Sequence, residues 1–192
     1  MKNSKVKLFT HAIDTDGIGC LILARLAFSH VDYTLVTRHG YKPHLALRDF
    51  LDSEEADNYD LIFVTDVFPG GLNLRRIKSS PALLAKFFWF DHHLSSLKSA
   101  ATLPHHAIIK TENSPCATSI FYDWLTTNHH LASTPQIAEF VELTRISDTG
   151  DSPDPTEIKK ATALKSHLRH LGPEKYADEI VLKHLSQGQS LR

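Results

Sequence analysis

The sequence lacks the features that would place the chain in a membrane or an oxidising compartment. Its longest mainly apolar runs, such as 20–24 and 83–90, fall well below the roughly 20 residues that a membrane-spanning helix requires. The start of the sequence has no apolar stretch of about 7–15 residues like that of a signal peptide. Two cysteines, Cys20 and Cys116, cannot build a disulfide framework, and their spacing is not that of a metal-ligand pair. We therefore expect a cytoplasmic protein with no membrane partner.

The sequence also lacks a surplus of either charge. Lys and Arg number 21 and Asp and Glu 22, which gives a formal net charge of −1. Because no global field attracts polyanions, any contact with nucleic acid must be local. The length of 192 residues and the 42% hydrophobic content suit one domain with a sizeable core. Histidine stands out instead, with 13 residues, most of which are expected to have no catalytic or metal-binding role.

Strand and helix patterns alternate through about residue 125. The expected strands and helices of this part are, in order, strand 6–11, helix 18–28, strand 33–37, helix 43–51, strand 61–65 and strand 86–90. The last two strands are almost wholly apolar, as expected of strands buried on both faces. Alternating strands and helices favour right-handed βαβ units. We therefore predict an α/β protein with a parallel β-sheet flanked by helices.

From Cys116 onward the pattern is helical. The expected helices are 117–126, 135–147, 155–171 and 173–185. A stretch rich in Asp, Pro and Gly, 148–155, separates two of them. We predict a domain over residues 1–152 and a helical C-terminal extension over residues 153–192, which either packs on that domain or leads to a second one.

Acidic and histidine side chains follow three of the predicted strands. They are His11, Asp14 and Asp16 after the first strand, Asp66 after strand 61–65, and Asp91, His92 and His93 after strand 86–90. Ligands of open parallel sheets bind beyond the carboxyl ends of the strands, where these residues would meet. So many carboxylates at one edge would repel one another, and divalent cations remove that repulsion.

The ligand types indicate which metal the site would hold. Carboxylate oxygen with some imidazole suits Mn²⁺, with Mg²⁺, Fe²⁺ or Co²⁺ as alternatives, and the lack of thiolates argues against structural zinc. More than four ligands suggest two ions. In two-metal hydrolases the ions lie about 3.5–4 Å apart and share a water that becomes hydroxide near neutral pH. This pattern predicts hydrolysis of a phosphate ester by metal-bound hydroxide.

Four successive motifs resemble those of the DHH phosphoesterase superfamily, which includes RecJ-type exonucleases, nano-RNases, cyclic-dinucleotide phosphodiesterases and family II pyrophosphatases. They are His11-Ala-Ile-Asp14-Thr-Asp16-Gly17, Asp66 after an apolar strand, Asp91-His92-His93 and Asp148-Thr149-Gly150. They occur in the family's order over roughly residues 5–150, which is far more specific than a lone D-H-H. The segment 116–122 and the tail around 168–176 resemble, more loosely, NrnB-type oligoribonucleases.

The resemblance implies two ions and six ligands. His11, Asp14 and Asp66 would hold one ion, and Asp16, Asp66, His92 and Asp148 the other. Asp66 would therefore bridge them. Two residues separate His11 from Asp14, whereas related enzymes have one or three. For the last motif, Asp151 and Asp154 remain alternatives to Asp148.

The resemblance also implies two catalytic residues and a reaction. His93 would face the phosphate and donate a hydrogen bond or proton where charge develops, and Asp91 would fix the tautomer of an imidazole. The implied function is hydrolysis of phosphodiester bonds in short oligonucleotides, RNA or DNA. Relatives that cleave oligonucleotides carry a second domain over the site, and nothing in 151–192 resembles it, so a fragment or a homodimer remains open.

Other interpretations stay open beside this one. The same centre would also suit a small phosphate compound such as pyrophosphate or a cyclic dinucleotide, or a non-catalytic metal-binding regulatory module. The D-x-D-G pattern also occurs in haloacid-dehalogenase phosphatases, but D-H-H has no role there.

The remaining residues of note are expected to be structural or solvated. Cys20, Cys116 and the aromatic run 87–90 are expected in the core. The histidines expected at the surface are His30, His39, His44, His105, His106, His129, His130, His167, His170 and His184. Arg38 and His39 follow the second predicted strand, from where they could reach a phosphate, but we assign them no such role.

Overall fold

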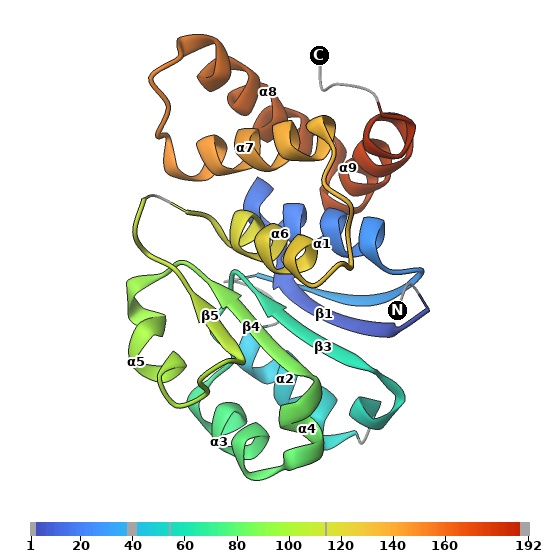
Figure 1. The fold of residues 1–192 in the computed structure, drawn as a ribbon, viewed down its shortest axis with the longest axis vertical. Helices are drawn as coiled ribbons and strands as arrows, with labels where there is room; N and C mark the ends of the chain where they lie inside the picture. Colours follow the sequence, from blue (N-terminus) through green and yellow to red (C-terminus); the bar gives the residue numbers. More distant parts are fainter. Residues whose placement is uncertain (1–2, 38–41, 54, 114, 189–192) are drawn as a thin grey trace.

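A computed structural model describes residues 3–37, 42–53, 55–113 and 115–188 of the chain. Within these residues five strands form one sheet in the order β2-β1-β3-β4-β5, and every neighbouring pair is parallel (Figure 1). The strands are β1 (Lys5–His11), β2 (His30–Val36), β3 (Leu61–Thr65), β4 (Phe87–Asp91) and β5 (Ala107–Ile109). The predicted α/β class, with a parallel sheet flanked by helices, is confirmed.

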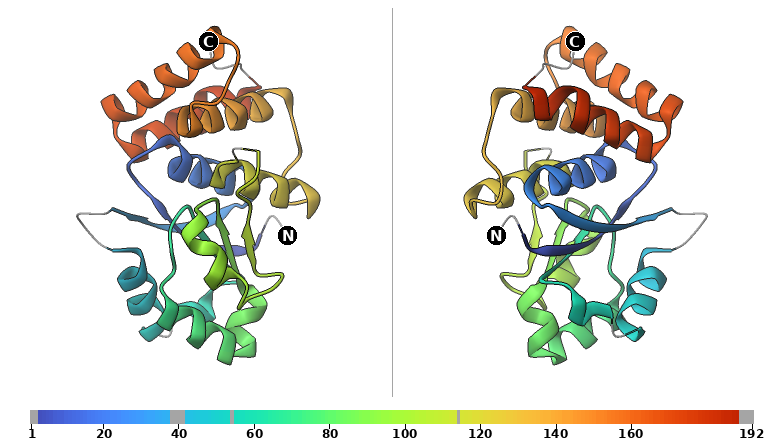
Figure 2. Two further views of the ribbon diagram at one scale, coloured as in Figure 1. Left: turned by 90° about the vertical axis from the view of Figure 1, so that its left-hand side faces the viewer. Right: turned by 90° about the vertical axis from the view of Figure 1, so that its right-hand side faces the viewer.

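Helices cover both faces of the sheet (Figure 1). One face carries α1 (Thr15–Ala27) and α6 (Ala117–Thr127), and the other carries α2 (Pro43–Asp52), α3 (Gly71–Ser79), α4 (Pro81–Lys86) and α5 (Leu97–Ala100). A further layer packs over α1 and α6 and consists of α7 (Pro135–Thr149), α8 (Pro155–Leu171) and α9 (Pro173–Glu179), which continues into a π-helical turn, η3 (Ile180–His184) (Figure 2). None of the described helices is long and apolar enough to cross a bilayer.

Successive side chains of the central strands point to opposite faces of the sheet, so the hydrophobic core consists of two clusters, one on each face. In β3, Phe63 packs in the cluster beneath α1 and α6, whereas Ile62 and Val64 pack in the cluster beneath α2 and α3. In β4, Phe90 and Trp89 divide in the same way, and both are fully buried. The central strands are thus buried on both faces, as their apolar sequences predict.

The C-terminal helices belong to the core on the α1 side. Leu164 and Leu168 of α8 and Tyr176 of α9 join the same buried cluster as Leu21 of α1. The described part of the C-terminal extension therefore packs on the rest of the chain. A domain boundary at residue 152 stays a prediction.

Helix α1 begins at Thr15, three residues before the predicted start, so the glycines expected in a loop lie inside the helix. A Cβ atom on Gly17 would lie 2.2 Å from the carbonyl oxygen of His11, and one on Gly19 would lie 2.4 Å from Oγ1 of Thr118. These glycines allow β1 and α6 to approach α1 closely, although a glycine in the middle of a helix is otherwise destabilising. The local sequence pattern could not distinguish glycines that allow close packing of a helix from glycines in a turn.

Other boundaries also differ from prediction. Helix α7 continues to Thr149, so Asp148 lies in its last turn, and Gly150 ends the helix in a left-handed conformation (φ 70°). Strand β5, with three residues, and the short helices α3, α4 and α5 were not predicted, because such short segments carry little periodicity.

Two histidines expected at the surface are instead half-buried among aromatic rings. His130 stacks on Trp124 with ring centroids 5.1 Å apart, and His106 lies 5.4 Å from Phe88. Cys20 and Cys116 are buried, as predicted. The structure places His30, His44, His105, His129 and His170 at the surface. Arg38 and His39 lie outside the described residues.

Candidate metal centre

The order of the strands brings the predicted site residues to one edge of the sheet. The chain leaves β1 for β2 on one side and then returns to β3 on the other, so a topological switch point lies between β1 and β3. Open parallel sheets bind ligands at such points, beyond the carboxyl ends of the strands. His11 ends β1, Asp66 follows β3 and Asp91 ends β4.

All eight predicted site residues meet there. Their ligand atoms form three overlapping groups, each with all its atoms within 4.8 Å of one another. The groups are His11, Asp14 and Asp66; Asp16, His92 and Asp148; and Asp66, Asp91, His92 and His93. The first group is the predicted ligand set of one ion. We call the eight residues together the acidic centre.

His92 faces three carboxylates that come from different parts of the chain. Its Nε2 atom lies 3.6 Å from Oδ2 of Asp16, 3.5 Å from Oδ1 of Asp66 and 3.7 Å from Oδ2 of Asp148. These separations exceed those of good hydrogen bonds. They suit donor atoms that surround a common point, and the four residues are the predicted ligand set of the second ion.

The side chain of Asp16 is held in place by residues that are distant in the sequence. The side chain is fully buried, and its carboxylate oxygens accept hydrogen bonds from the backbone N–H groups of Ala117 (2.8 Å) and Thr118 (2.7 Å). Thr118 also donates its hydroxyl to the backbone carbonyl of Asp16, at 2.6 Å. The N-terminus of α6 therefore orients this acid. The sequence does not reveal this partnership, because about 100 residues separate the partners.

Asp66 occupies a left-handed backbone conformation (φ 57°) directly after β3. Asp adopts this conformation more readily than most residues. Burial raises the pKa of Asp66 well above its usual range, and the negative charges of Asp16 and Asp14 raise it further. A cation would offset both effects, so the surroundings of Asp66 fit a divalent ion.

Asp91 and His93 form a hydrogen-bonded pair. Asp91 Oδ1 lies 2.6 Å from Nδ1 of His93, and Oδ2 accepts the hydroxyl of Ser96 at 2.6 Å. Burial by itself raises the pKa of Asp91, but the hydrogen bonds from His93 and Ser96 outweigh it and lower the pKa. The hydrogen bond to Asp91 raises the pKa of His93. Asp91 therefore orients His93 and stabilises its protonated form.

Asp14 has both a structural role and a place in the acidic centre. It caps α1 by accepting the backbone N–H of Gly17 at 3.1 Å, and its other oxygen lies 2.9 Å from Nδ1 of His11. Burial raises its pKa, but the hydrogen bonds from His11 and Gly17 give a net lowering. Nδ1 of His11 lies 3.9 Å from Asp66.

Asp148 is the acid of the last motif that reaches the acidic centre. Thr15 donates its hydroxyl to Ser147 at 2.9 Å, which ties the start of α1 to the last turn of α7. Burial and the charge of Asp16 raise the pKa of Asp148 to about 6. Asp151 is exposed beside Arg145, and Asp154 caps α8.

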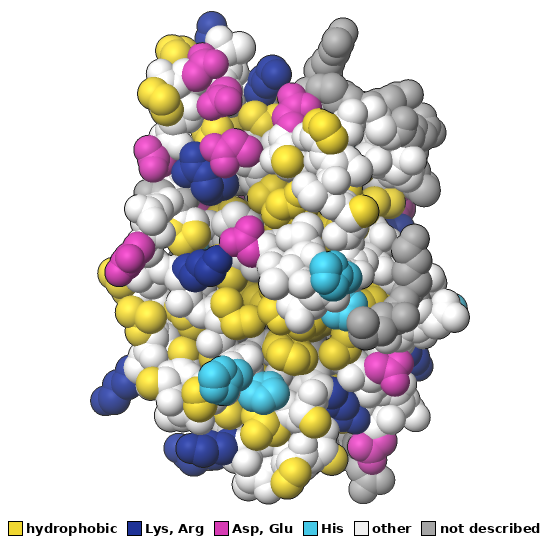
Figure 3. All heavy atoms as spheres, viewed as in Figure 1, with side chains coloured by type: hydrophobic (Ala, Val, Ile, Leu, Met, Phe, Trp, Pro, Cys, Tyr) yellow, Lys and Arg dark blue, Asp and Glu magenta, His cyan; other side chains and the backbone are white. Residues whose placement is uncertain are grey.

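A cavity of about 350 Å³ opens over the acidic centre. Five of the six predicted metal ligands line it, all except the fully buried Asp16, and Val67, Phe68 and Ser95 are among the other lining residues. On the face shown in Figure 3, the described Lys and Arg side chains are scattered among acidic ones and form no continuous basic stripe. This face therefore offers no extended basic surface to a nucleic acid.

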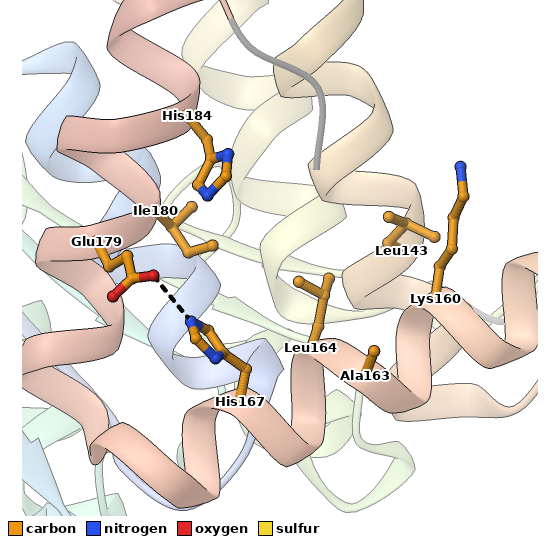
Figure 4. Close-up of a pocket in the computed structure, with 8 residues that line it drawn as sticks. All are labelled: Leu143, Lys160, Ala163, Leu164, His167, Glu179, Ile180 and His184. Carbon is orange, nitrogen blue, oxygen red and sulfur yellow. Dashed lines mark hydrogen bonds and ion pairs between the residues drawn. The ribbon is translucent and has the colours of Figure 1, made fainter. Parts of the chain in front are cut away.

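A second cavity, of about 320 Å³, lies between the C-terminal helices (Figure 4). We call it the helical cleft. Its lining is mainly apolar, with Leu143, Leu164 and Ile180, and His167 Nε2 lies 3.3 Å from Oε1 of Glu179. His167 and His184 thus line a cleft, where the sequence predicted solvated helix surface.

Comparison with known proteins finds one distant curated relative. No model of a known protein family matches the chain. Over 150 residues the chain is 30% identical to a Bacillus subtilis (strain 168) protein named oligoribonuclease NrnB, a match that covers 74% of this chain. The matched part spans 36% of that relative, so the chain corresponds to about a third of its length.

A crystal structure of an uncharacterized protein from Helicobacter pylori G27 has a similar fold. The TM-score is 0.70 at 18% sequence identity, and the match covers 87% of this chain and 49% of that one. Because the identity is low, the similarity concerns the fold. This chain again spans about half of a longer protein.

Proposed function

We propose that this chain is a DHH-type phosphoesterase domain that hydrolyses phosphodiester bonds of short oligonucleotides with two divalent ions, of which Mn²⁺ suits the ligands best. The observation that carries the proposal is the convergence of eight acids and histidines from separate segments into three overlapping ligand groups. The name of the curated relative, an oligoribonuclease, supports the same reaction class.

The donor atoms of the acidic centre fit such ions. Carboxylate oxygens and imidazole nitrogens suit Mn²⁺, and Mg²⁺ or Co²⁺ would also be accepted. His11 and Asp14 would hold one ion, Asp16, His92 and Asp148 the other, and Asp66 both. When bound, the ions would activate a water near neutral pH and withdraw charge from the phosphate.

Asp91 and His93 would act on the substrate without holding an ion. Nδ1 of His93 is engaged by Asp91, so its Nε2 is the atom that can approach a phosphate oxygen in the cavity. The hydrogen bond to Asp91 raises the pKa of His93, which favours the protonated form of the ring. That proton would be donated to the oxygen on which charge develops as the phosphodiester breaks.

The cavity favours a short substrate. Its volume of about 350 Å³ is near the lower end of the roughly 300–1,000 Å³ of small-molecule sites, which suits the end of a short oligonucleotide. The balanced net charge argues against a long nucleic acid as substrate.

The test is a substrate panel in the presence of Mn²⁺. We expect mononucleotides to be released from a labelled dinucleotide and pentanucleotide, and pyrophosphate to remain intact. Orthophosphate release from pyrophosphate with both oligonucleotides untouched would contradict the proposed substrate class.

Two acids in one short segment, Asp148 and Asp151, provide a test substitution and its matched control. Asp148→Asn should lower the hydrolysis rate by roughly 100-fold or more, because it removes a metal ligand. Asp151→Asn removes an equal charge three residues away, where the side chain is exposed, and should leave the rate within about twofold. Equal effects of the two substitutions would contradict the assignment of Asp148.

A further inference from the structure

Large apolar side chains are exposed beside the acidic centre. Among the described residues, each of the three turns that carry its predicted ligands after β1, β3 and β4 exposes one: Ile13, Phe68 and Leu94. A single exposed apolar residue needs no explanation. Phe68 differs because it lines the cavity itself, together with the candidate ligands, and is 43% exposed.

The ring of Phe68 is held in place from behind. It meets Trp89 edge to face, with centroids 5.7 Å apart and an interplanar angle of 62°. Trp89 is fully buried in β4 and gives a fixed support. Such edge-to-face contacts favour one ring orientation over others.

The backbone around Phe68 is anchored as well. Val67 and Pro69, its neighbours, are both buried. The buried Asn73 side chain donates to the carbonyl of Pro69 at 2.8 Å and to that of His44 at 2.8 Å. An anchored turn thus presents a half-exposed aromatic ring two residues from the central ligand Asp66.

We propose that Phe68 is a substrate-binding residue that stacks on the nucleobase next to the phosphate held at the acidic centre. A flat ring on a cavity wall offers the same contact to every base, so it recognises a nucleotide end with little preference for sequence. The inference rests on the proposed function and deepens it, because it distinguishes oligonucleotides from phosphate compounds that carry no base.

Binding of a product-like nucleotide tests this without turnover. The probe is the fluorescent nucleotide 2-aminopurine riboside 5′-monophosphate, titrated into the full chain with Mg²⁺, and ribose 5-phosphate serves as the ligand without a base. For the wild-type chain we expect quenched fluorescence, and tighter binding of the nucleotide than of ribose 5-phosphate. Equal affinities of the two ligands, or an unquenched probe, would overturn the proposal.

Substitutions then assign the effect to the ring. Phe68→Ala should weaken nucleotide binding by about tenfold, within the roughly 5- to 150-fold typical of one base stack, and leave ribose 5-phosphate binding unchanged. Phe68→Tyr should keep wild-type affinity. Leu72→Ala, the control, removes an apolar side chain that is 75% exposed at the start of α3, and should change neither affinity. A loss of affinity for both ligands in Phe68→Ala would indicate a structural role and overturn the proposal.

Turnover separates this inference from the proposed function. Hydrolysis of a dinucleotide with a KM that Phe68→Ala leaves unchanged would overturn the inference and keep the function. Base-dependent binding that Phe68→Ala abolishes, in a chain that hydrolyses no oligonucleotide, would support the inference and contradict the function.

Discussion

The cavity over the acidic centre and the helical cleft have similar volumes, and histidine and acidic side chains line both. In the cleft one acid, Glu179, meets one histidine, His167, and both side chains are partly exposed. In the acidic centre Asp16 and Asp66 are nearly or fully buried, and the donor atoms of several segments lie within 4.8 Å of one another. The convergence of buried carboxylates, more than the presence of histidine, is what makes the acidic centre and not the helical cleft a candidate site for a cation.

Substitution of Asp66 should give the largest difference in hydrolysis rate between a variant of the acidic centre and a variant of the helical cleft. Asp66→Asn should reduce hydrolysis by more than the roughly 100-fold that loss of a ligand's supporting partner causes, because Asp66 belongs to two ligand groups. Glu179→Gln, the matched substitution in the helical cleft, should leave hydrolysis within about twofold. Rates with Mn²⁺ and a dinucleotide measure both. Similar rates for the two variants would remove the distinction between the cavities.

Asp91→Asn should have the next largest effect. The amide cannot stabilise a protonated His93 as the carboxylate does, so kcat should fall by roughly 10- to 100-fold while Mn²⁺ affinity changes little. The lower pKa of His93 should also shift the alkaline limb of the kcat profile to lower pH. A pH series of kcat and a metal titration measure the two effects. An unchanged pH profile would show that Asp91 has a structural role.

The stability of the metal-free chain should depend on pH through the acidic centre. The pKa values of Asp148, at about 6, and Asp66 are raised, so the folded state binds more protons than the unfolded state above pH 4. Stability should therefore fall as pH rises from about 4 through 6 and beyond. Saturating Mn²⁺ should reverse the fall, by about 2.7 kcal/mol at 100 times its Kd.

Thermal unfolding at pH 5 and pH 8, with and without Mn²⁺, measures this dependence. The gain in Tm on adding Mn²⁺ should be larger at pH 8, because protons compete with the ion at pH 5. The same gain in the Asp66→Asn variant would show that the ion binds elsewhere.

The sequence indicates the acidic centre better than it indicates what holds the centre together. Asp66 and Asp91 could be predicted because each follows an apolar run of strand length, and parallel strands end at one edge. The partnership of Asp16 with Thr118 could not, since it depends on how α6 packs against α1. A glycine at position 19 is needed for that packing, because a Cβ atom there would collide with Thr118. In the sequence alone, however, a glycine at this position also fits a turn.

The helical cleft and the exposure of Phe68 lay beyond sequence reasoning for a related reason. Helical spacing places His167 on a face of α8, but only the packing of α9 decides that the face lines a cleft. Phe68 follows an apolar strand, and nothing local distinguishes an aromatic residue on a cavity wall from one in the core.

Anomalous X-ray scattering from crystals grown with Mn²⁺ would locate any ions bound at the acidic centre. We expect two peaks about 3.5–4 Å apart, one on each side of the Asp66 carboxylate. Density at neither position, or a peak beside His167 and Glu179 in its place, would contradict this expectation.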